Sequence, residues 1–133
     1  MGWRAVRLGY EAFNRRDFDA VLINYHREVQ LIPPTALVQA GVVESSYRGH
    51  DGYRRYFREW LSAWGAYRGE TQELIDLGDR YLTLGWLEGR GGGSRVPVTQ
   101  EHASLMIMRD GLVIRQQEYW SRAEALEAVG LQE

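Results

Sequence analysis

The chain has 133 residues, a length typical of one domain (residues 1–133) with a core of its own. It contains no cysteine, and its 16 basic residues are all arginine, so disulfides, thiolate chemistry and lysine Schiff bases are excluded. The formal net charge is −2 without a block of like charge, which favours neither nucleic acid nor an anionic membrane surface as a partner. No apolar stretch approaches ~20 residues, and residues 1–7 lack the apolar run of a signal peptide, so we expect a cytoplasmic protein without a membrane span.

The first part of the chain has apolar residues at helical spacing. This spacing predicts a helix over residues 3–14 and, after a break at which Asp17 is placed to cap, a second helix over 17–26. A short strand over 28–32 follows and is stopped by the two prolines after it, and residues 35–47 are predicted to be irregular or weakly extended.

A third helix is predicted over residues 50–65. Its aromatic and aliphatic residues recur at i, i+3 and i+4 on one face, and arginines occupy much of the other face. A stripe of this kind is typical of a helix packed on a core, and some of its rings could also line a cavity.

The second half of the chain alternates between apolar and polar residues and predicts antiparallel strands. In order, we expect strands at 69–77 and 80–88, a glycine-rich loop at 89–95 and a long hairpin over 96–120. Ser121 is placed to cap a short last helix that Gly130 ends. Helices followed by antiparallel strands indicate an α+β fold with helices on one face of a curved sheet.

The long hairpin carries the most informative polar residues. If residues 109–111 form a three-residue loop, His102 lies opposite Glu118, with Cβ atoms roughly 5 Å apart. The same register places Ser104 opposite Gln116, so all four side chains share one face. A histidine beside a carboxylate on a rigid sheet indicates an acid–base pair. A two-residue turn is the competing register, which would shift the pairing by one residue and separate His102 from Glu118.

The order of elements and several segments resemble the nuclear transport factor 2-like superfamily, and in detail its SnoaL-like polyketide cyclase branch. The matching segments are residues 10–19, 25–29, 47–53, 105–114 and 118–120. The resemblance implies a conical α+β barrel: a curved, mostly antiparallel sheet with three helices on its concave face and a short C-terminal helix. It also implies a homodimer through the outer face of the sheet. Because the superfamily includes isomerases, dehydratases, epoxide hydrolases, aldol cyclases and non-catalytic proteins, it implies a cavity but no single chemistry.

The resemblance carries over to individual residues in part. In the SnoaL-like cyclases an aspartate on the last strand, followed by an aromatic residue, is the acid–base residue, and Glu118 occupies that place. Their pocket histidine falls at Ser104, whereas here the histidine is His102, two residues earlier on the same face. The apparatus of ketosteroid isomerases is missing, because their oxyanion tyrosine falls near Gly9 and their second acid at Ser104.

Aromatic residues make up 12% of the chain, which suits a cavity lined with rings. We expect the catalytic residues to be Glu118 and His102. The expected substrate-binding residues are Ser104, Gln116, Tyr10, Phe13, Trp60, Trp64, Trp86, Met106 and Trp120. The face of the sheet on which Trp86 lies is left undecided, because a shift of one residue in the register would reverse it. The three histidines lack metal-ligand spacing, so we expect neither a metal nor a cofactor.

These patterns predict a cofactor-free acid–base enzyme acting on a small apolar carbonyl compound, as an isomerase, a cyclase or an eliminating lyase. Glu118 would take the proton, and His102, Ser104 and Gln116 would orient it or donate to the developing oxyanion. The alternative is a non-catalytic small-molecule-binding or accessory protein of the same fold, including an engineered family member.

Overall fold

The computed structural model describes residues 2–64, 67–90 and 97–132, with the side chains of 63–64, 67, 90 and 97–98 outside this description. Its helices are α1 (Trp3–Asn14), α2 (Phe18–Leu22), α3 (Thr35–Gln39), α4 (Gly49–Trp64) and α5 (Arg122–Ala128). Its strands are β1 (Tyr25–Ile32), β2 (Tyr47–Arg48), β3 (Tyr67–Asp76), β4 (Arg80–Arg90), β5 (Pro97–Arg109) and β6 (Leu112–Tyr119).

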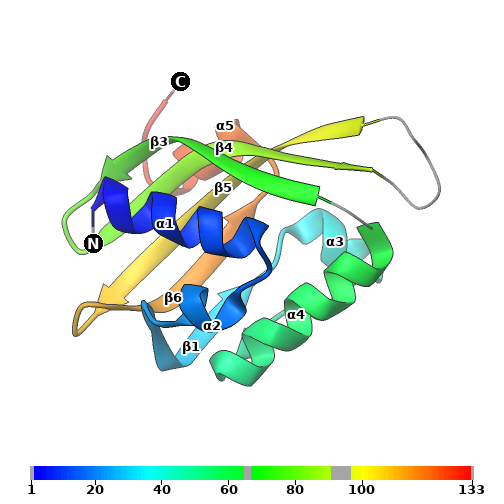
Figure 1. The fold of residues 1–133 in the computed structure, drawn as a ribbon. Coiled ribbons are helices and arrows are strands. Elements are labelled where there is room, and N and C mark those ends of the chain that lie inside the picture. Colours follow the sequence, from blue (N-terminus) through cyan, green and yellow to red (C-terminus); the bar gives the residue numbers. More distant parts are fainter. Residues whose placement is uncertain (1, 65–66, 91–96, 133) are drawn as a thin grey trace.

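The six strands form one curved sheet in the order β2-β1-β6-β5-β4-β3 (Figure 1). All neighbouring pairs are antiparallel except β1 and β6, which run parallel. The edge strands β2 and β3 do not pair with each other, so the cone stays open on one side. The predicted α+β class and mostly antiparallel sheet are confirmed.

Helices α1, α2 and α4 cover the concave face of the sheet and form the main core with it (Figure 1). The second helix ends at Leu22, earlier than predicted, because the chain is already extended in β1 from Tyr25. Asp17 caps this helix as expected, with its carboxylate accepting a hydrogen bond from the backbone N–H of Ala20. The aromatic stripe of α4, including Tyr56 and Trp60, is buried in the core.

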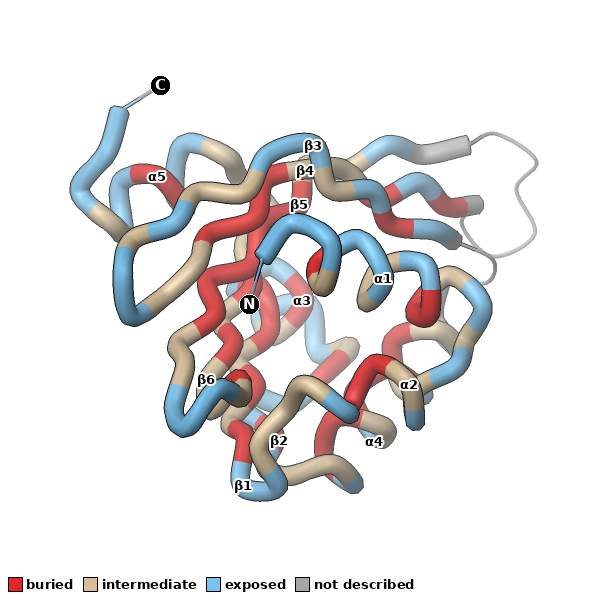
Figure 2. Tube along the Cα trace, turned by 60° about the vertical axis from the view of Figure 1, so that its left-hand side comes forward, coloured by how far each residue is buried: buried red, intermediate tan, exposed pale blue. Residues whose placement is uncertain are grey.

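Other boundaries differ modestly from the predicted ones. The segment predicted to be irregular contains α3 and β2, and the strand β4 extends to Arg90. Most of the glycine-rich loop predicted over residues 89–95 lies outside the described residues, as does residue 96, where the hairpin was predicted to begin. Buried segments in Figure 2 concentrate on the central strands and on the sides of the helices that face them.

Helix α5 packs on the opposite, outer face of the sheet. Its Ala125 and Leu126 contact the buried cluster that includes Leu82, Leu84 and Leu105. Ser121 caps the helix by accepting a hydrogen bond from the N–H of the third residue after it. Because of α5, the middle of the outer face is covered within a single chain. Within the described part of the chain, no helix combines the length and apolar character needed to cross a membrane.

The long hairpin turns through two residues rather than three. Asp110 and Gly111 both have positive φ angles, 54° and 78°, as a tight two-residue hairpin turn requires, and Arg109 pairs with Leu112. Of the two registers left open by the sequence, the three-residue loop is therefore wrong, and the competing two-residue turn is present.

A β-bulge then restores the predicted faces. Met108 pairs with Val113, but Ile107 pairs with Arg115, so β6 carries one extra residue between these two pairs. The turn shifts the pairing by one residue and the bulge shifts it by one more. Because side chains alternate between faces with a period of two, this double shift returns the side chains of β6 beyond the bulge, from Arg115 onwards, to their expected faces.

A second irregularity bends the sheet at β3 and β4. The register between these strands shifts after Thr71, opposite Gly85. A Cβ atom at Gly85 would lie 1.9 Å from the carbonyl oxygen of Glu70, a distance that no real side chain tolerates. Glycine at this position therefore lets the two backbones approach closely.

Candidate functional site

A cavity of about 70 Å³ lies between the concave face of the sheet and the helices α1, α2 and α4. One water needs roughly 10–15 Å³ of such space, so the cavity holds several waters or a small organic group. The residues that line it are Ala5, Val6, Gly9, Tyr10, Phe13, Val21, Asn24, Tyr25, Tyr53, Phe57, Trp60, Thr83, Leu87, His102, Ser104, Met106, Gln116 and Glu118.

An acid–base pair lies on the sheet side of this cavity. The register places Glu118 opposite Ser104 and not opposite His102, so the predicted direct pairing is wrong. His102 is instead the diagonal neighbour of Glu118 on the same face, within reach of a long side chain. Its Nε2 lies 2.6 Å from Glu118 Oε2, and the two side chains are only 8% and 5% exposed. A contact this short between buried groups is typical of a charge-assisted hydrogen bond.

Gln116 and Tyr25 extend this pair into a hydrogen-bonded chain. Gln116 donates from Nε2 to Glu118 Oε1 at 3.4 Å, and its own Oε1 accepts from the Tyr25 hydroxyl. The chain thus runs from Tyr25 on β1 through Gln116 to Glu118 on β6 and then to His102 on β5. Each side chain has its orientation set by a neighbour, which is the arrangement that holds a reactive carboxylate still.

Two tyrosines place protonated phenols over the polar floor. The Tyr10 hydroxyl of α1 lies 3.5 Å from Thr83 Oγ1 of β4. Burial raises the pKa of Tyr10 above its ordinary value, and burial also raises the pKa of Tyr25 well above the usual range, with the nearby Tyr10 and Glu118 adding to the shift. Both phenols therefore stay protonated at neutral pH and can donate hydrogen bonds.

Aromatic rings make up the opposite wall. Phe13 and Phe57 pack edge to face with ring centroids 4.8 Å apart, and Phe57 contacts Tyr53 and Trp60 at 4.6 and 6.1 Å. These buried rings come from α1 and α4 and present apolar surface to the cavity. Such a wall excludes water and suits an apolar ligand.

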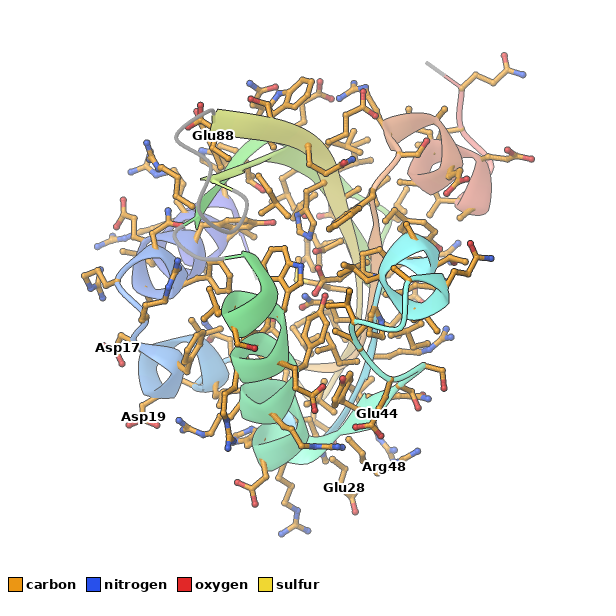
Figure 3. The ribbon with its side chains drawn as sticks, turned by 90° about the vertical axis from the view of Figure 1, so that its right-hand side faces the viewer. Asp17, Asp19, Glu28, Glu44, Arg48 and Glu88 are labelled. Carbon is orange, nitrogen blue, oxygen red and sulfur yellow. The ribbon has the colours of Figure 1, made fainter. Side chains whose placement is uncertain are left out.

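The cavity lining contains no arginine, although the chain has 16 basic residues, all arginine. Figure 3 shows charged side chains, including Asp17, Asp19, Glu28, Arg48 and Glu88, pointing away from the interior. Within the described residues, no group of three or more acidic or histidine side chains is placed to hold a metal ion. Glu118 and His102 are therefore the acidic and the basic side chain among the described lining residues.

The structure brings most of the predicted site residues together. Those that line the cavity are Glu118, His102, Ser104, Gln116, Tyr10, Phe13, Trp60 and Met106. The side chain of Trp64 lies outside the described residues.

Two predicted lining residues lie elsewhere. Trp86 pairs with Glu101 and shares the outer face with Leu84, where its Nε1 donates to Gln72 Oε1 at 3.0 Å. Its assignment to the cavity is corrected, because the register turns its side chain to the other face. Trp120 is partly buried against the main core and does not line the cavity, because β6 ends before it and the alternation no longer sets its direction.

Several lining residues were not predicted from the sequence, among them Tyr25, Tyr53, Phe57 and Thr83. Tyr25 was assigned to a helix, although it begins a strand beside β6. Tyr53 and Phe57 belong to the recognised aromatic stripe of α4, so their signal was present but was interpreted as core. No sequence pattern marked Thr83 as a lining residue, because its face is set by the pairing of β4 with β5.

Comparisons with known proteins agree with this architecture. The family model for the SnoaL-like domain matches residues 6–116. No curated protein matches the chain. An NTF2-like protein of unknown function from Burkholderia pseudomallei is 24% identical, with a TM-score of 0.79 over 96% of this chain and 95% of that one.

Two other similar structures contain small molecules. TerC, co-crystallized with polyporic acid, is 24% identical, with a TM-score of 0.77 over 93% of this chain and 94% of its own. A hypothetical protein with a ketosteroid isomerase-like fold from Catenulispora acidiphila, in complex with trimethylamine, is 14% identical, with a TM-score of 0.73 over 98% and 95%. These likenesses show the fold. Because the family model covers most of the chain, the protein belongs to the family of SnoaL-like domains.

Proposed function

We propose that the protein is a cofactor-free acid–base enzyme acting on a small, largely apolar carbonyl compound, as an isomerase, a cyclase or an eliminating lyase. The observation that carries this proposal is the 2.6 Å contact between His102 and Glu118 in a cavity walled by aromatic rings. Two structures of the same fold hold small organic molecules, polyporic acid and trimethylamine, which supports small-molecule binding.

Glu118 is the proposed base, and its two oxygens have different roles. Oε2 is engaged by His102, whereas Oε1 has only the long 3.4 Å contact from Gln116. Oε1 is therefore the oxygen available to take a proton from a carbon next to a carbonyl. His102 holds the carboxylate in place, and a base fixed on a sheet loses little entropy in reaching its substrate.

The electrons of the broken C–H bond move onto the carbonyl oxygen, which needs hydrogen-bond donors. The Tyr10 hydroxyl can turn to this oxygen, because its 3.5 Å contact with Thr83 is at the limit of a hydrogen bond. The raised pKa of Tyr10 keeps this donor protonated. The Ser104 hydroxyl, on the same floor, is a second donor. Glu118 then returns the proton to another atom or leaves the carbanion to close a ring.

Hydrogen exchange at carbon tests this step without knowledge of the product. A panel of aromatic ketones and lactones is incubated with the protein in deuterated buffer, and loss of the α-proton signal is followed by NMR. We expect Glu118→Gln to lower the exchange rate by ~10²–10⁴-fold, because the amide keeps the shape of the side chain but cannot accept the proton.

Glu88→Gln is the matched control, since Glu88 is an exposed carboxylate that does not line the cavity. We expect the Glu88→Gln variant to catalyse α-proton exchange at the wild-type rate. If the Glu118→Gln variant catalysed α-proton exchange of the panel compounds at the wild-type rate, Glu118 could not be the base.

A second candidate function is ligand binding without turnover. It is favoured by one observation: His102, Glu118 and Gln116 already satisfy one another, so a ligand could bind through the rings alone. Intrinsic tryptophan fluorescence would report such binding through Trp60, which lines the cavity. A ligand that changes the fluorescence but shows no hydrogen exchange in any member of the panel would favour this function.

A further inference from the structure

We propose that Gly9 forms the entrance to the cavity and sets the size of the molecules that reach Glu118. This inference deepens the proposed function, since it concerns access to the same site, and it names a residue that limits which substrates enter.

The exposed part of the cavity lining is confined to one region. Thirteen of the lining residues are buried, and the partly exposed ones are Ala5, Gly9, Tyr10, Asn24 and Tyr25. These five residues, called the mouth below, come from α1 and from residues 24–25, where the chain enters β1. Solvent therefore meets the cavity between helix α1 and the segment that enters the first strand.

Neither backbone geometry nor packing explains a glycine at position 9. Gly9 lies inside the helix α1 and does not have a positive φ angle. Glycine in a helix interior is less stable than alanine. A Cβ atom at Gly9 would meet no atom within 4 Å, whereas one at Gly69 would lie 3.2 Å from the ring of Tyr10 and one at Gly85 would collide with backbone.

Because Gly9 has no side chain, open space remains beside it at the mouth. Any larger residue would project its side chain into that space, because Gly9 lies on the cavity side of the helix. Two other residues of the mouth take part in the polar network: the Tyr25 hydroxyl donates to Gln116, and the Tyr10 hydroxyl lies near Thr83. Gly9 is thus a position at which a single substitution narrows the entrance without disturbing the acid–base pair.

The absence of cysteine permits a direct test, because one introduced thiol is the only thiol in the protein. Ser104→Cys places a thiol of nearly the same size on the cavity floor, and Met106→Cys is a second reporter on the same face. Each thiol is labelled with methyl methanethiosulfonate and with the longer benzyl methanethiosulfonate, and the rates are followed by mass spectrometry.

We expect Gly9→Leu to slow the labelling of both reporters by at least about tenfold, because access then requires helix α1 to open locally. The effect should be larger for the benzyl than for the methyl reagent. Gly9→Ala should give an intermediate rate and raise the thermal unfolding midpoint by a few degrees. Arg7→Leu, which adds the same side chain on the exposed side of α1, should leave the rates unchanged.

Ala103→Cys is the control for unfolding, since Ala103 is fully buried on the other face under α5 and should react slowly in every background. Unchanged labelling in the Gly9→Leu background would overturn the proposal. So would reporters on the floor that react no faster than the Ala103→Cys thiol when Gly9 is present. Labelling involves no turnover and leaves Glu118 and His102 intact, so this test can fail while the proposed chemistry stands.

Discussion

The buried pair of His102 and Glu118 is expected to cost stability when either partner is removed alone. Both side chains are less than a tenth exposed, and their contact is 2.6 Å. In His102→Leu, Glu118 keeps only the 3.4 Å contact from Gln116, so a buried carboxylate loses its main partner. Breaking a buried ionic pair in this way costs about 3–5 kcal/mol. We expect a loss near the lower figure, about 3 kcal/mol, because the cavity can admit water.

The reverse single variant should be less costly. Glu118→Met leaves His102 buried without its carboxylate partner, and an imidazole that loses one hydrogen bond costs about 1–3 kcal/mol. The double variant His102→Leu with Glu118→Met removes both polar groups and fills the space with apolar atoms of similar volume. Replacing a whole buried pair is often neutral or stabilising by about 1–4 kcal/mol. We therefore expect the double variant to match or exceed the wild-type stability.

Urea unfolding followed by circular dichroism measures all four proteins on one scale. The slopes of the free energy of unfolding against urea should agree, which licenses comparison of the extrapolated values. The coupling free energy is the change in the double variant minus the sum of the two single changes, and we expect it to be several kcal/mol.

Two results would refute this reasoning. One is a His102→Leu variant within about 0.5 kcal/mol of the wild type, which is the size of an ordinary surface change. The other is additive single effects, which would mean that the two groups act independently. A double variant that is stable but does not catalyse α-proton exchange of the panel compounds would indicate that the pair is retained for chemistry rather than for stability.

Three further predictions follow from other parts of the fold. Gly85→Ala should lower the free energy of unfolding by at least about 2 kcal/mol, because a Cβ at this position would lie 1.9 Å from the carbonyl oxygen of Glu70 and the backbone must move away. A urea midpoint equal to that of the wild type would contradict the close approach of the two backbones. Burial and a hydrogen bond to Glu59 raise the pKa of Tyr47 to about 12, above the value near 10 of an unfolded chain, so its contribution to stability is complete below pH ~10 and declines as the pH rises towards 12. The ultraviolet absorbance of tyrosinate should reveal this late ionisation of Tyr47. A difference titration between the wild type and Tyr47→Phe that lacks a late ionisation step would contradict the raised pKa. We also expect a homodimer through the part of the outer sheet face that α5 leaves uncovered, and light scattering at micromolar concentration that gives only the 15.4 kDa chain would argue against it.

The sequence by itself determined the two long helices and the class of the fold, because hydrophobic periodicity is a local property, whereas the short helix α3 was not predicted. The spacing of apolar residues predicted α1 over residues 3–14, and the aromatic stripe predicted α4 within one residue at each end. Alternation also determined that His102 and Ser104 share one face of their strand and that Gln116 and Glu118 share one face of theirs. Whether these two pairs lie on the same face of the sheet depends on the register.

Pairing between strands was decided only by the tertiary structure. The turn at Asp110 and the bulge in β6 each shift the register by one residue, and no local pattern shows that the second shift compensates the first. His102 therefore meets Glu118 diagonally rather than directly across. Trp86 illustrates the same limit, because a single register step decides whether its ring faces the cavity or the outer surface.

The shape of the cavity also depended on contacts between distant segments. Tyr25 and Gln116 are 91 residues apart in the chain, and their hydrogen bond exists only because β1 lies parallel to β6. The open space beside Gly9 likewise depends on how α1 sits over the sheet. Residue spacing determines which side chains can share a face, whereas the packing of helices on the sheet determines which of them enclose a site.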